Sequence, residues 1–210
     1  MRKDLTDITV VLDRSGSMAS CQSDAEGGLN TFIKKQQEEP GEAVFSLVQF
    51  DTEYEFVHKA TPIKAVSHCT MVPRGCTALL DAVGRAIIET GERLKGIDEH
   101  IRPGLVVFVI ITDGQENASR EFTRAKIKEM IEHQQSNYKW QFTFLGANQD
   151  AFHEAGAMGI NLAGVANYAE VKTAGAFMAA SDNVGRMRSA TVRGQSVKNE
   201  YTEDELNKMA

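Results

Sequence analysis

The stretch Asp7-Ile-Thr-Val-Val-Leu-Asp13, followed by Arg14-Ser-Gly-Ser-Met18, decides the fold of this 210-residue chain. Its first part is short, apolar and β-branched, which is typical of a strand that is buried on both faces. Residues 105–111 have the same character, and the polar run Thr112-Asp-Gly-Gln-Glu-Asn117 follows them. Strands of this kind are typical of a parallel sheet that helices cover on both sides.

Helical and extended patterns alternate along the rest of the chain. Ser23 and Glu26 have the S-x-x-E spacing of a capping box, which predicts a helix that ends near Glu39, where Pro40-Gly41 follows. Further helices are expected at 77–95, 122–135, 150–158 and 171–187, and further strands at 43–50, 54–58, 140–145 and 160–165.

The connection between strands 43–50 and 54–58 is short. It allows a hairpin but no parallel crossover, so the strand 54–58 is expected to run antiparallel to the one before it. The alternation elsewhere predicts an α/β fold, a three-layer α/β/α sandwich with a mostly parallel sheet.

Two segments show no regular pattern. Residues 61–76 contain Pro62, Pro73 and Gly75 and are expected to be irregular. Residues 191–210 are polar and lack a clear apolar face, which predicts a tail or a loosely docked segment. The expected organisation is therefore one domain over 1–190 and a polar C-terminal tail over 191–210.

Charge and composition exclude several classes of protein. The formal net charge of −6 argues against a nucleic-acid-binding protein. The most apolar stretch covers only 105–111, whereas a membrane helix needs about 20 residues, so no membrane span is expected. Met1-Arg2-Lys3-Asp4 is not followed by an apolar run, which argues against a secretory signal and favours a cytoplasmic location.

The three cysteines, Cys21, Cys69 and Cys76, form no C-x-x-C pair. An odd number without such a pair favours reduced, unpaired thiols in an intracellular protein. A redox pair between Cys69 and Cys76 is the alternative.

Candidate metal ligands follow the central strands and precede one helix. In parallel α/β folds, ligands bind beyond the carboxyl ends of the strands. Two carboxylates and three hydroxyls should meet at that edge, namely Asp13, Ser15, Ser17, Thr77 and Asp113. Oxygen donors without imidazole or thiolate favour Mg²⁺, Mn²⁺ or Ca²⁺ over zinc, and so few carboxylates leave a coordination position for an outside carboxylate.

These residues resemble the metal-ion-dependent adhesion site of von Willebrand factor A (VWA) domains. The family motif D-x-S-x-S is met by Asp13, Ser15 and Ser17. The family's G-x-T-x-L-x-D-A pattern is close to Gly75-Cys-Thr-Ala-Leu-Leu-Asp81, which contains Thr77, and its distal aspartate is met by Asp113 in Thr112-Asp-Gly114.

The resemblance covers roughly residues 5–190, and Cys76 stands where the family often has a small residue such as Gly. It implies a Rossmann-like six-stranded sheet with one antiparallel edge strand. It also implies that Ser15, Ser17 and Thr77 touch the ion through their hydroxyls, and that Asp13 and Asp113 do so directly or through water.

Three further carboxylates lie near the expected site. Asp81 follows Thr77 by one helical turn, and we expect it to form a local polar contact at the start of the helix. We expect Asp51 and Glu116 to shape acidic surroundings rather than to bind the ion. A zinc protease is excluded, because Ala157 stands where the second histidine of H-E-x-x-H would follow His153.

Three functions remain in competition. The resemblance to stand-alone bacterial or phage VWA proteins implies a non-enzymatic adaptor whose metal takes an Asp or Glu of a protein partner, such as an AAA+ ATPase or a kinase/phosphatase system. A Mg²⁺-dependent phosphoryl-transfer enzyme using Asp13 is the alternative. Ser15 weakens it, because haloacid-dehalogenase-like phosphatases have an aspartate there as general acid. A structural subunit of a larger assembly is the third reading.

Overall fold

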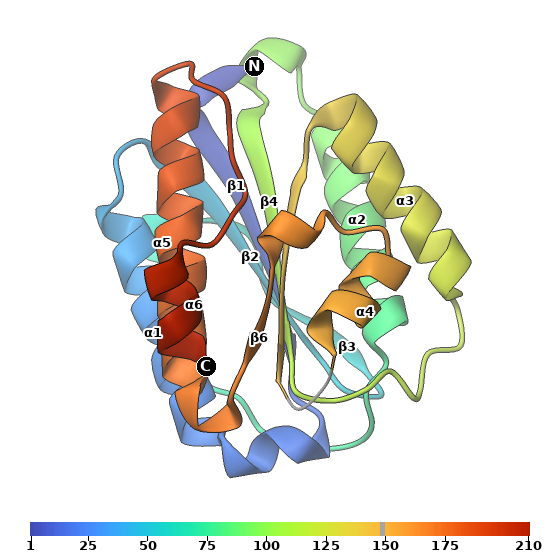
Figure 1. The fold of residues 1–210 in the computed structure, drawn as a ribbon. Coiled ribbons are helices and arrows are strands. Elements are labelled where there is room, and N and C mark those ends of the chain that lie inside the picture. Colours follow the sequence, from blue (N-terminus) through green and yellow to red (C-terminus); the bar gives the residue numbers. More distant parts are fainter. Residues whose placement is uncertain (148–149) are drawn as a thin grey trace.

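A single sheet forms the centre of the molecule in the computed structural model, which describes residues 1–147 and 150–210 (Figure 1). The sheet has six strands in the order β3-β2-β1-β4-β5-β6. β3 is antiparallel to β2, and the remaining neighbours are parallel. The strands are β1 (Arg2–Asp13), β2 (Glu42–Phe50), β3 (Tyr54–Pro62), β4 (Pro103–Thr112), β5 (Gln141–Ala147) and β6 (Val165–Tyr168).

Helices cover both faces of the sheet, which gives the expected three-layer sandwich. One face carries α1 (Gln22–Glu38), α5 (Thr173–Val192) and α6 (Glu203–Met209), and the other carries α2 (Leu79–Lys95), α3 (Arg124–Tyr138) and α4 (Ala151–Ala157) (Figure 1). Short 3₁₀ turns are η1 (Gly16–Ser20), η2 (Ile63–Ala65), η3 (Glu99–Ile101), η4 (Leu162–Gly164) and η5 (Glu170–Lys172).

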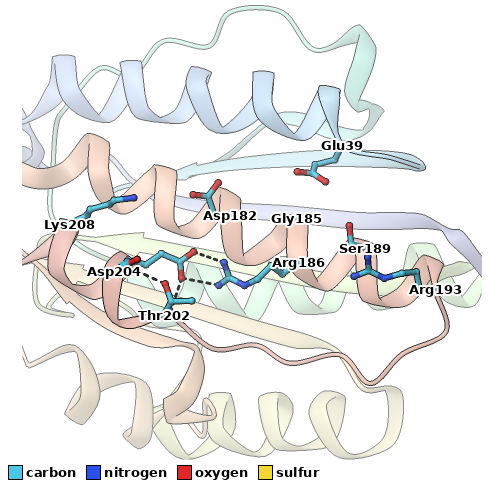
Figure 2. Close-up of a pocket in the computed structure, with 10 residues that line it drawn as sticks. Glu39, Asp182, Gly185, Arg186, Ser189, Arg193, Thr202, Asp204 and Lys208 are labelled. Carbon is cyan, nitrogen blue, oxygen red and sulfur yellow. Dashed lines mark hydrogen bonds and ion pairs between the residues drawn. The ribbon is translucent and has the colours of Figure 1, made fainter.

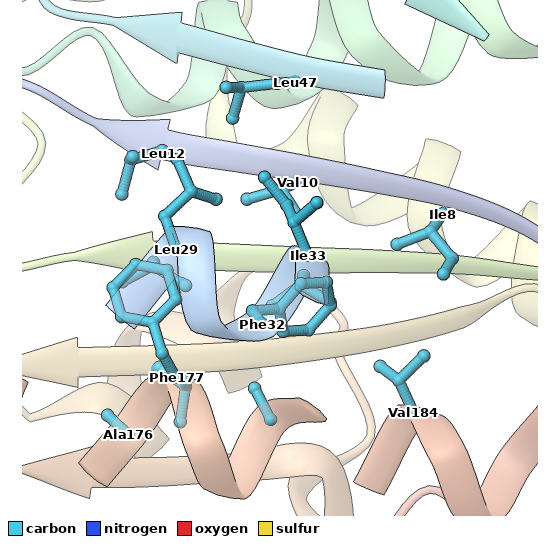
Figure 3. Packing of buried hydrophobic residues seen from close by; sticks show 14 of the residues in the cluster. Ile8, Val10, Leu12, Leu29, Phe32, Ile33, Leu47, Ala176, Phe177 and Val184 are labelled. Atoms are coloured by element: carbon cyan, nitrogen blue, oxygen red, sulfur yellow. The ribbon is translucent and has the colours of Figure 1, made fainter. Parts of the chain in front are cut away.

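The central strand β1 is buried on both faces because its side chains alternate between the two helical layers. Ile8, Val10 and Leu12 belong to the cluster under α1 and α5, where Phe32 and Phe177 fill the space (Figure 3). Val11 belongs to the opposite cluster under α2 and α3. The predicted fold class, the hairpin and the antiparallel edge strand are therefore confirmed.

Two local predictions are wrong. Ser23 does not cap α1, because the helix begins at Gln22 with Cys21 as N-cap and no side-chain cap bond. Glu26 instead accepts a hydrogen bond from the backbone N–H of Met71, 2.9 Å away. The last strand is Val165–Tyr168 rather than 160–165, because its register against β5 pairs Val165 with Phe144.

The prediction of a loosely docked C-terminal tail is also wrong. α6 begins with a complete capping box between Thr202 and Glu205. Met209 is fully buried in the cluster under α1 and α5, and Val197 and Tyr201 pack against the same cluster. The boundary near residue 190 stays a prediction. Among the helices of residues 1–147 and 150–210, none is long and apolar enough to cross a membrane.

Candidate metal centre

The five predicted ligands come from three segments at the carboxyl edge of the sheet. Asp13 is the last residue of β1, and Asp113 directly follows β4, the strand paired with β1 in the middle of the sheet. Ser15 and Ser17 lie in the turn between β1 and α1, and Thr77 lies two residues before α2. The parallel arrangement of β1 and β4 is what brings the two carboxylates to the same edge.

Hydrogen bonds connect four of the five residues. The hydroxyl of Ser17 donates to Oδ1 of Asp113 at 2.7 Å and lies 3.1 Å from the hydroxyl oxygen of Ser15. The backbone N–H of Ser15 donates to Oδ1 of Asp13 at 2.6 Å. The first and third segments are therefore joined through the two serines.

Thr77 enters the same group of oxygens beside Gly114. A β-carbon on Gly114 would lie 2.8 Å from Oγ1 of Thr77, 3.4 Å from Oγ of Ser17 and 3.6 Å from Oδ2 of Asp13. Oxygens from the first two segments therefore surround one point, and any side chain at position 114 would enter that space. Asp113 of the third segment is linked to this group through its hydrogen bond from Ser17. The residues fit a hard divalent cation, because the oxygens that converge are carboxylate and hydroxyl oxygens.

Four of the five predicted ligands are buried, and one is exposed to solvent. Asp13, Ser15, Thr77 and Asp113 are buried, whereas Ser17 is exposed. Within the part of the chain that the structure describes, no group of three or more His, Cys, Asp or Glu side chains could hold a metal ion. A cation site here therefore depends on hydroxyls as well as on two carboxylates.

Burial makes the two carboxylates costly to ionise. Burial raises the pKa of Asp13, although hydrogen bonds from Thr112 and Ser15 oppose the shift. Burial, aided by the negative charge of Asp13, raises the pKa of Asp113 to about 6. A cation between them would favour the ionised form of both side chains.

Solved structures share this arrangement of strands and helices. A von Willebrand factor type A protein from Catenulispora acidiphila matches with a TM-score of 0.62 at 15% identity, over 86% of this chain and 42% of that chain. The chain has a von Willebrand factor A fold. The manganese-loaded TRAP protein of Plasmodium vivax matches with a TM-score of 0.57 at 13% identity, over 86% of this chain and 74% of that chain.

The mussel byssus protein PTMP1 has the same VWA fold, with a TM-score of 0.61 at 15% identity over 86% of this chain and 46% of that chain. The chain spans less than half the length of the mussel and Catenulispora proteins that it matches. No protein-family model matches the sequence, and no curated protein matches it. At these identities the likeness is one of fold.

Asp81 and Glu116 hold the loop after β4. Asp81 accepts hydrogen bonds from the backbone N–H groups of Arg120, Glu121 and Phe122 at 2.8 to 2.9 Å. It therefore makes a polar contact at the start of α2, as expected, but the contact is not local, because its partners are about 40 residues away in the sequence. Glu116 accepts from the backbone N–H of Leu80 and from residues 118 and 119. The carboxylate of Glu116 therefore caps backbone groups, and the expectation that it makes the surroundings more acidic stays a prediction.

Sequence reasoning missed two residues that shape the site. Thr112 donates its hydroxyl proton to Oδ2 of Asp13 at 2.6 Å. Asn117 accepts from the backbone N–H of Thr77 at 3.0 Å and donates its own N–H to the Thr77 carbonyl at 3.1 Å. Both belong to the polar run after β4, which is the signal that could have found them.

The cysteines take no part in the hydrogen bonds that join the predicted ligands. Cys21, Cys69 and Cys76 are all free, with Cys69 buried and Cys76 exposed. Whether Cys69 and Cys76 ever form a redox pair stays open.

Proposed function

We propose that this VWA fold is a divalent-cation-dependent protein-binding module and not an enzyme. The observation that carries the proposal is that oxygens of Asp13, Ser17 and Thr77 converge beside Gly114, while the exposed Ser17 also bonds the carboxylate of Asp113. Mg²⁺, Mn²⁺ or Ca²⁺ would be held by Asp13, Ser15, Ser17, Thr77 and Asp113. The manganese-loaded state of a protein with the same fold supports this choice of ion class.

The partner would contribute an Asp or Glu side chain to the bound ion. Hydroxyl ligands are neutral, so two carboxylates at most balance a charge of 2+, and an octahedral ion keeps a position for a further oxygen. The net charge of −6 would otherwise repel an acidic partner, so the ion has to supply the local attraction. An AAA+ ATPase or a kinase/phosphatase system stays a prediction for the identity of that partner.

Thermal unfolding with and without cation tests the metal centre. Saturating Mg²⁺, Mn²⁺ or Ca²⁺ should stabilise the fold by about 2.7 kcal/mol at a concentration one hundred times the Kd, and EDTA should remove the effect. Asp13→Asn should lose the stabilisation. Asp182→Asn is the matched control, because Asp182 pairs with Lys35 on the α1–α5 face and should leave it intact. A melting curve that none of the three ions changes would contradict the proposal.

Two further measurements separate the competing functions. A complex captured from the native host should dissociate with EDTA, form poorly with Asp13→Asn, and depend on one Asp or Glu of the partner. A complex that survives all three changes would place the interaction elsewhere. Turnover of a generic phosphate ester with Mg²⁺ that disappears in Asp13→Asn would instead favour the phosphoryl-transfer enzyme.

A further inference from the structure

The connection that delivers Thr77 to the candidate metal centre lacks regular structure but is held along its length. The side-chain amide of Asn30 bonds both the N–H and the carbonyl of Cys69 at 2.8 Å. Met71 is held in the same way by Glu26 and Gln22, at 2.9 and 2.7 Å. The backbone at residues 69–71 is therefore fixed by side chains of α1. The residues next to Thr77 depend on a different group of side chains.

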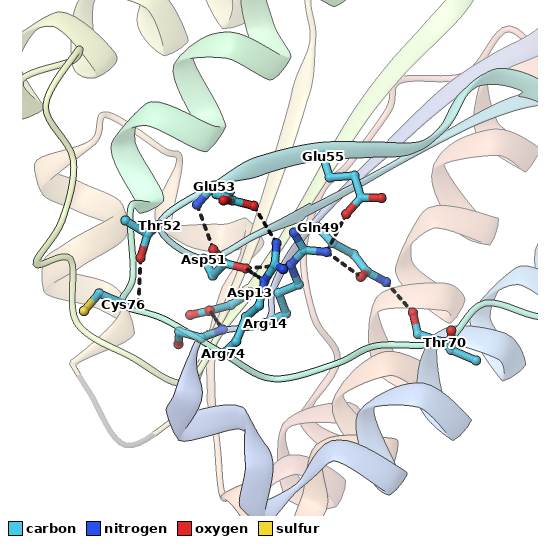
Figure 4. Close-up of polar contacts among 11 residues, drawn as sticks. Asp13, Arg14, Gln49, Asp51, Thr52, Glu53, Glu55, Thr70, Arg74 and Cys76 are labelled. Carbon is cyan, nitrogen blue, oxygen red and sulfur yellow. Dashed lines mark hydrogen bonds and ion pairs between the residues drawn. The ribbon is translucent and has the colours of Figure 1, made fainter.

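That group is a buried ion-pair cluster centred on Asp51, which follows β2 (Figure 4). Oδ2 of Asp51 accepts from Nε of Arg14 at 2.8 Å and from Nε of Arg74 at 2.9 Å. Oδ1 accepts from the backbone N–H of Glu53 at 2.7 Å, and the Asp51 carbonyl accepts from Ala78 N–H at 3.0 Å. One residue therefore contacts the turn after β1, the β2–β3 hairpin and both sides of Thr77.

The two arginines lie inside the segments that carry the predicted ligands. Arg14 stands between Asp13 and Ser15, and Arg74 is close before Thr77. Their backbones are also joined, because Arg74 N–H donates to the Arg14 carbonyl at 2.8 Å. A shift of either guanidinium would therefore move a ligand-bearing segment.

The turn at Gly75 completes this contact. Gly16 N–H donates to the Gly75 carbonyl at 3.2 Å. Gly75 has a φ of +66°, and a β-carbon there would lie 2.8 Å from Oγ1 of Thr52. The backbone passes too close to the hairpin to admit a side chain, so the loop position depends on this contact with residues 51–53.

The charge of Asp51 is compensated, so the expectation that it makes the rim more acidic is corrected. Asp51 is 2% exposed and Arg14 is 6% exposed. Arg14 also pairs with Glu55 at 2.6 Å, and the half-exposed Arg74 pairs with Glu53 at 2.6 Å. Loss of the Asp51 charge would leave the buried Arg14 with only the exposed Glu55, and removal of one partner from a buried pair is destabilising.

We propose that Asp51 is a positioning residue of the candidate metal centre: it binds no cation, but through Arg14 and Arg74 it holds Ser15, Ser17 and Thr77 at the distances that a cation needs. The inference rests on the proposed function, because it assigns Asp51 to that same centre. Residues that orient metal ligands typically change metal affinity by about 10- to 100-fold when substituted.

The test is the affinity for Mn²⁺, measured by electron paramagnetic resonance titration at a temperature where every variant is folded. Asp51→Asn should weaken Mn²⁺ binding by about 10-fold or more. Asp7→Asn is the matched control, because Asp7 is also a buried aspartate that pairs with an arginine, Arg93 at 2.8 Å, but it lies six residues before Asp13 in β1, away from the predicted ligands. Its Mn²⁺ affinity should stay close to that of the unsubstituted protein.

A second variant separates positioning from general stability. Arg74→Gln removes a half-exposed partner of Asp51 and should fold even if Asp51→Asn does not. It should weaken Mn²⁺ binding in the same direction, and the double variant should bind no more weakly than Asp51→Asn alone, because both changes break one contact.

Two outcomes overturn different statements. If the unsubstituted protein binds no Mn²⁺, the proposed metal centre fails. If it binds Mn²⁺ and both Asp51→Asn and Arg74→Gln bind it equally well, or if Asp7→Asn loses as much affinity as Asp51→Asn, the positioning role of Asp51 is overturned while the metal centre stands.

Discussion

Residues 66–78 and the C-terminal segment 195–210 both run for much of their length without regular structure, yet they are held in different ways. The first is fixed by polar side chains, such as Asn30 and Glu26, that bond its backbone at several points. The second relies more on buried apolar side chains, with Met209 fully buried. Its polar contacts include the bond from Asn199 to the Phe142 carbonyl at 2.8 Å and the ion pair between Arg186 and Glu205. The contrast suggests that polar contacts fix the position of a backbone, whereas apolar burial supplies the free energy that docks a segment onto the core.

The physical reason is the directionality of the two interactions. A hydrogen bond loses strength when its distance or angle changes, so a series of them fixes a backbone path. Apolar burial depends on area and tolerates small shifts. Candidate ligands such as Thr77 need the first kind of support, whereas a covering segment such as α6 can rely more on the second.

Met209→Ala should have the largest effect on stability. The loss of a fully buried methionine side chain should lower the free energy of unfolding by about 2–5 kcal/mol, measured by urea denaturation. Hydrogen exchange should rise in α6 and stay unchanged in 69–77. A variant that raises exchange equally in both segments would show that they unfold as one unit and would break the comparison.

Asn30→Ala should have the next largest effect, about 1–3 kcal/mol, because both backbone groups of Cys69 lose their partner. Hydrogen exchange should rise around residues 69–71 while α6 keeps its protection. Gln37→Ala is the control, since Gln37 bonds only carbonyls of residues 63 and 66, before this stretch. Equal exchange at 69–71 in Asn30→Ala and in the unsubstituted protein would contradict the polar mode of attachment.

The pair between Arg186 and Glu205 should give the C-terminal segment a pH dependence. Burial acts to raise the pKa of Glu205, but hydrogen bonds from Arg186 and from the Thr202 backbone outweigh it and hold the pKa below its usual 4.5. The pair therefore stabilises the fold at pH above about 4.5, and this contribution is lost as pH falls through the lowered pKa. Arg186 is partly exposed, so we expect less than about 1 kcal/mol.

Urea denaturation across this pH range measures that contribution. Glu205→Gln should flatten the curve below pH 4.5 and leave the stability almost unchanged once the pH lies below the lowered pKa of Glu205. High salt should reduce the difference, since the pair is partly solvated. A Glu205→Gln curve parallel to that of the unsubstituted protein would show that the ion pair contributes nothing to docking.

Lys126→Ala should have the smallest effect. Lys126 and Glu129 form an exposed pair on α3, 3.0 Å apart, which is worth about 0.2–0.5 kcal/mol in a helix. The variant shows how much stability is lost when an exposed polar contact that holds no loop or segment in place is removed. A loss above about 1 kcal/mol would show that exposed pairs contribute as much as the contacts of 66–78.

The helix caps show why part of the fold was misread. The S-x-x-E pattern at Ser23 matched a capping box, but Glu26 bonds Met71 instead. The same spacing at Thr202 and Glu205 was overlooked in a polar segment, and there the capping box is complete. A pattern at this spacing indicates that a capping box can form. Contacts with the rest of the fold decide whether the two side chains are free to form it.

The sequence by itself determined the alternation of strands and helices, the antiparallel edge strand, and the placement of Asp13 and Asp113 at strand ends. These features depend on local periodicity and on the rule that the ends of neighbouring parallel strands share an edge. Only the tertiary structure decided that Asp51 joins Arg14 to Arg74, that Asn117 holds Thr77, and that Met209 is buried. Each of these depends on contacts between residues far apart in the chain, whose geometry no local pattern records.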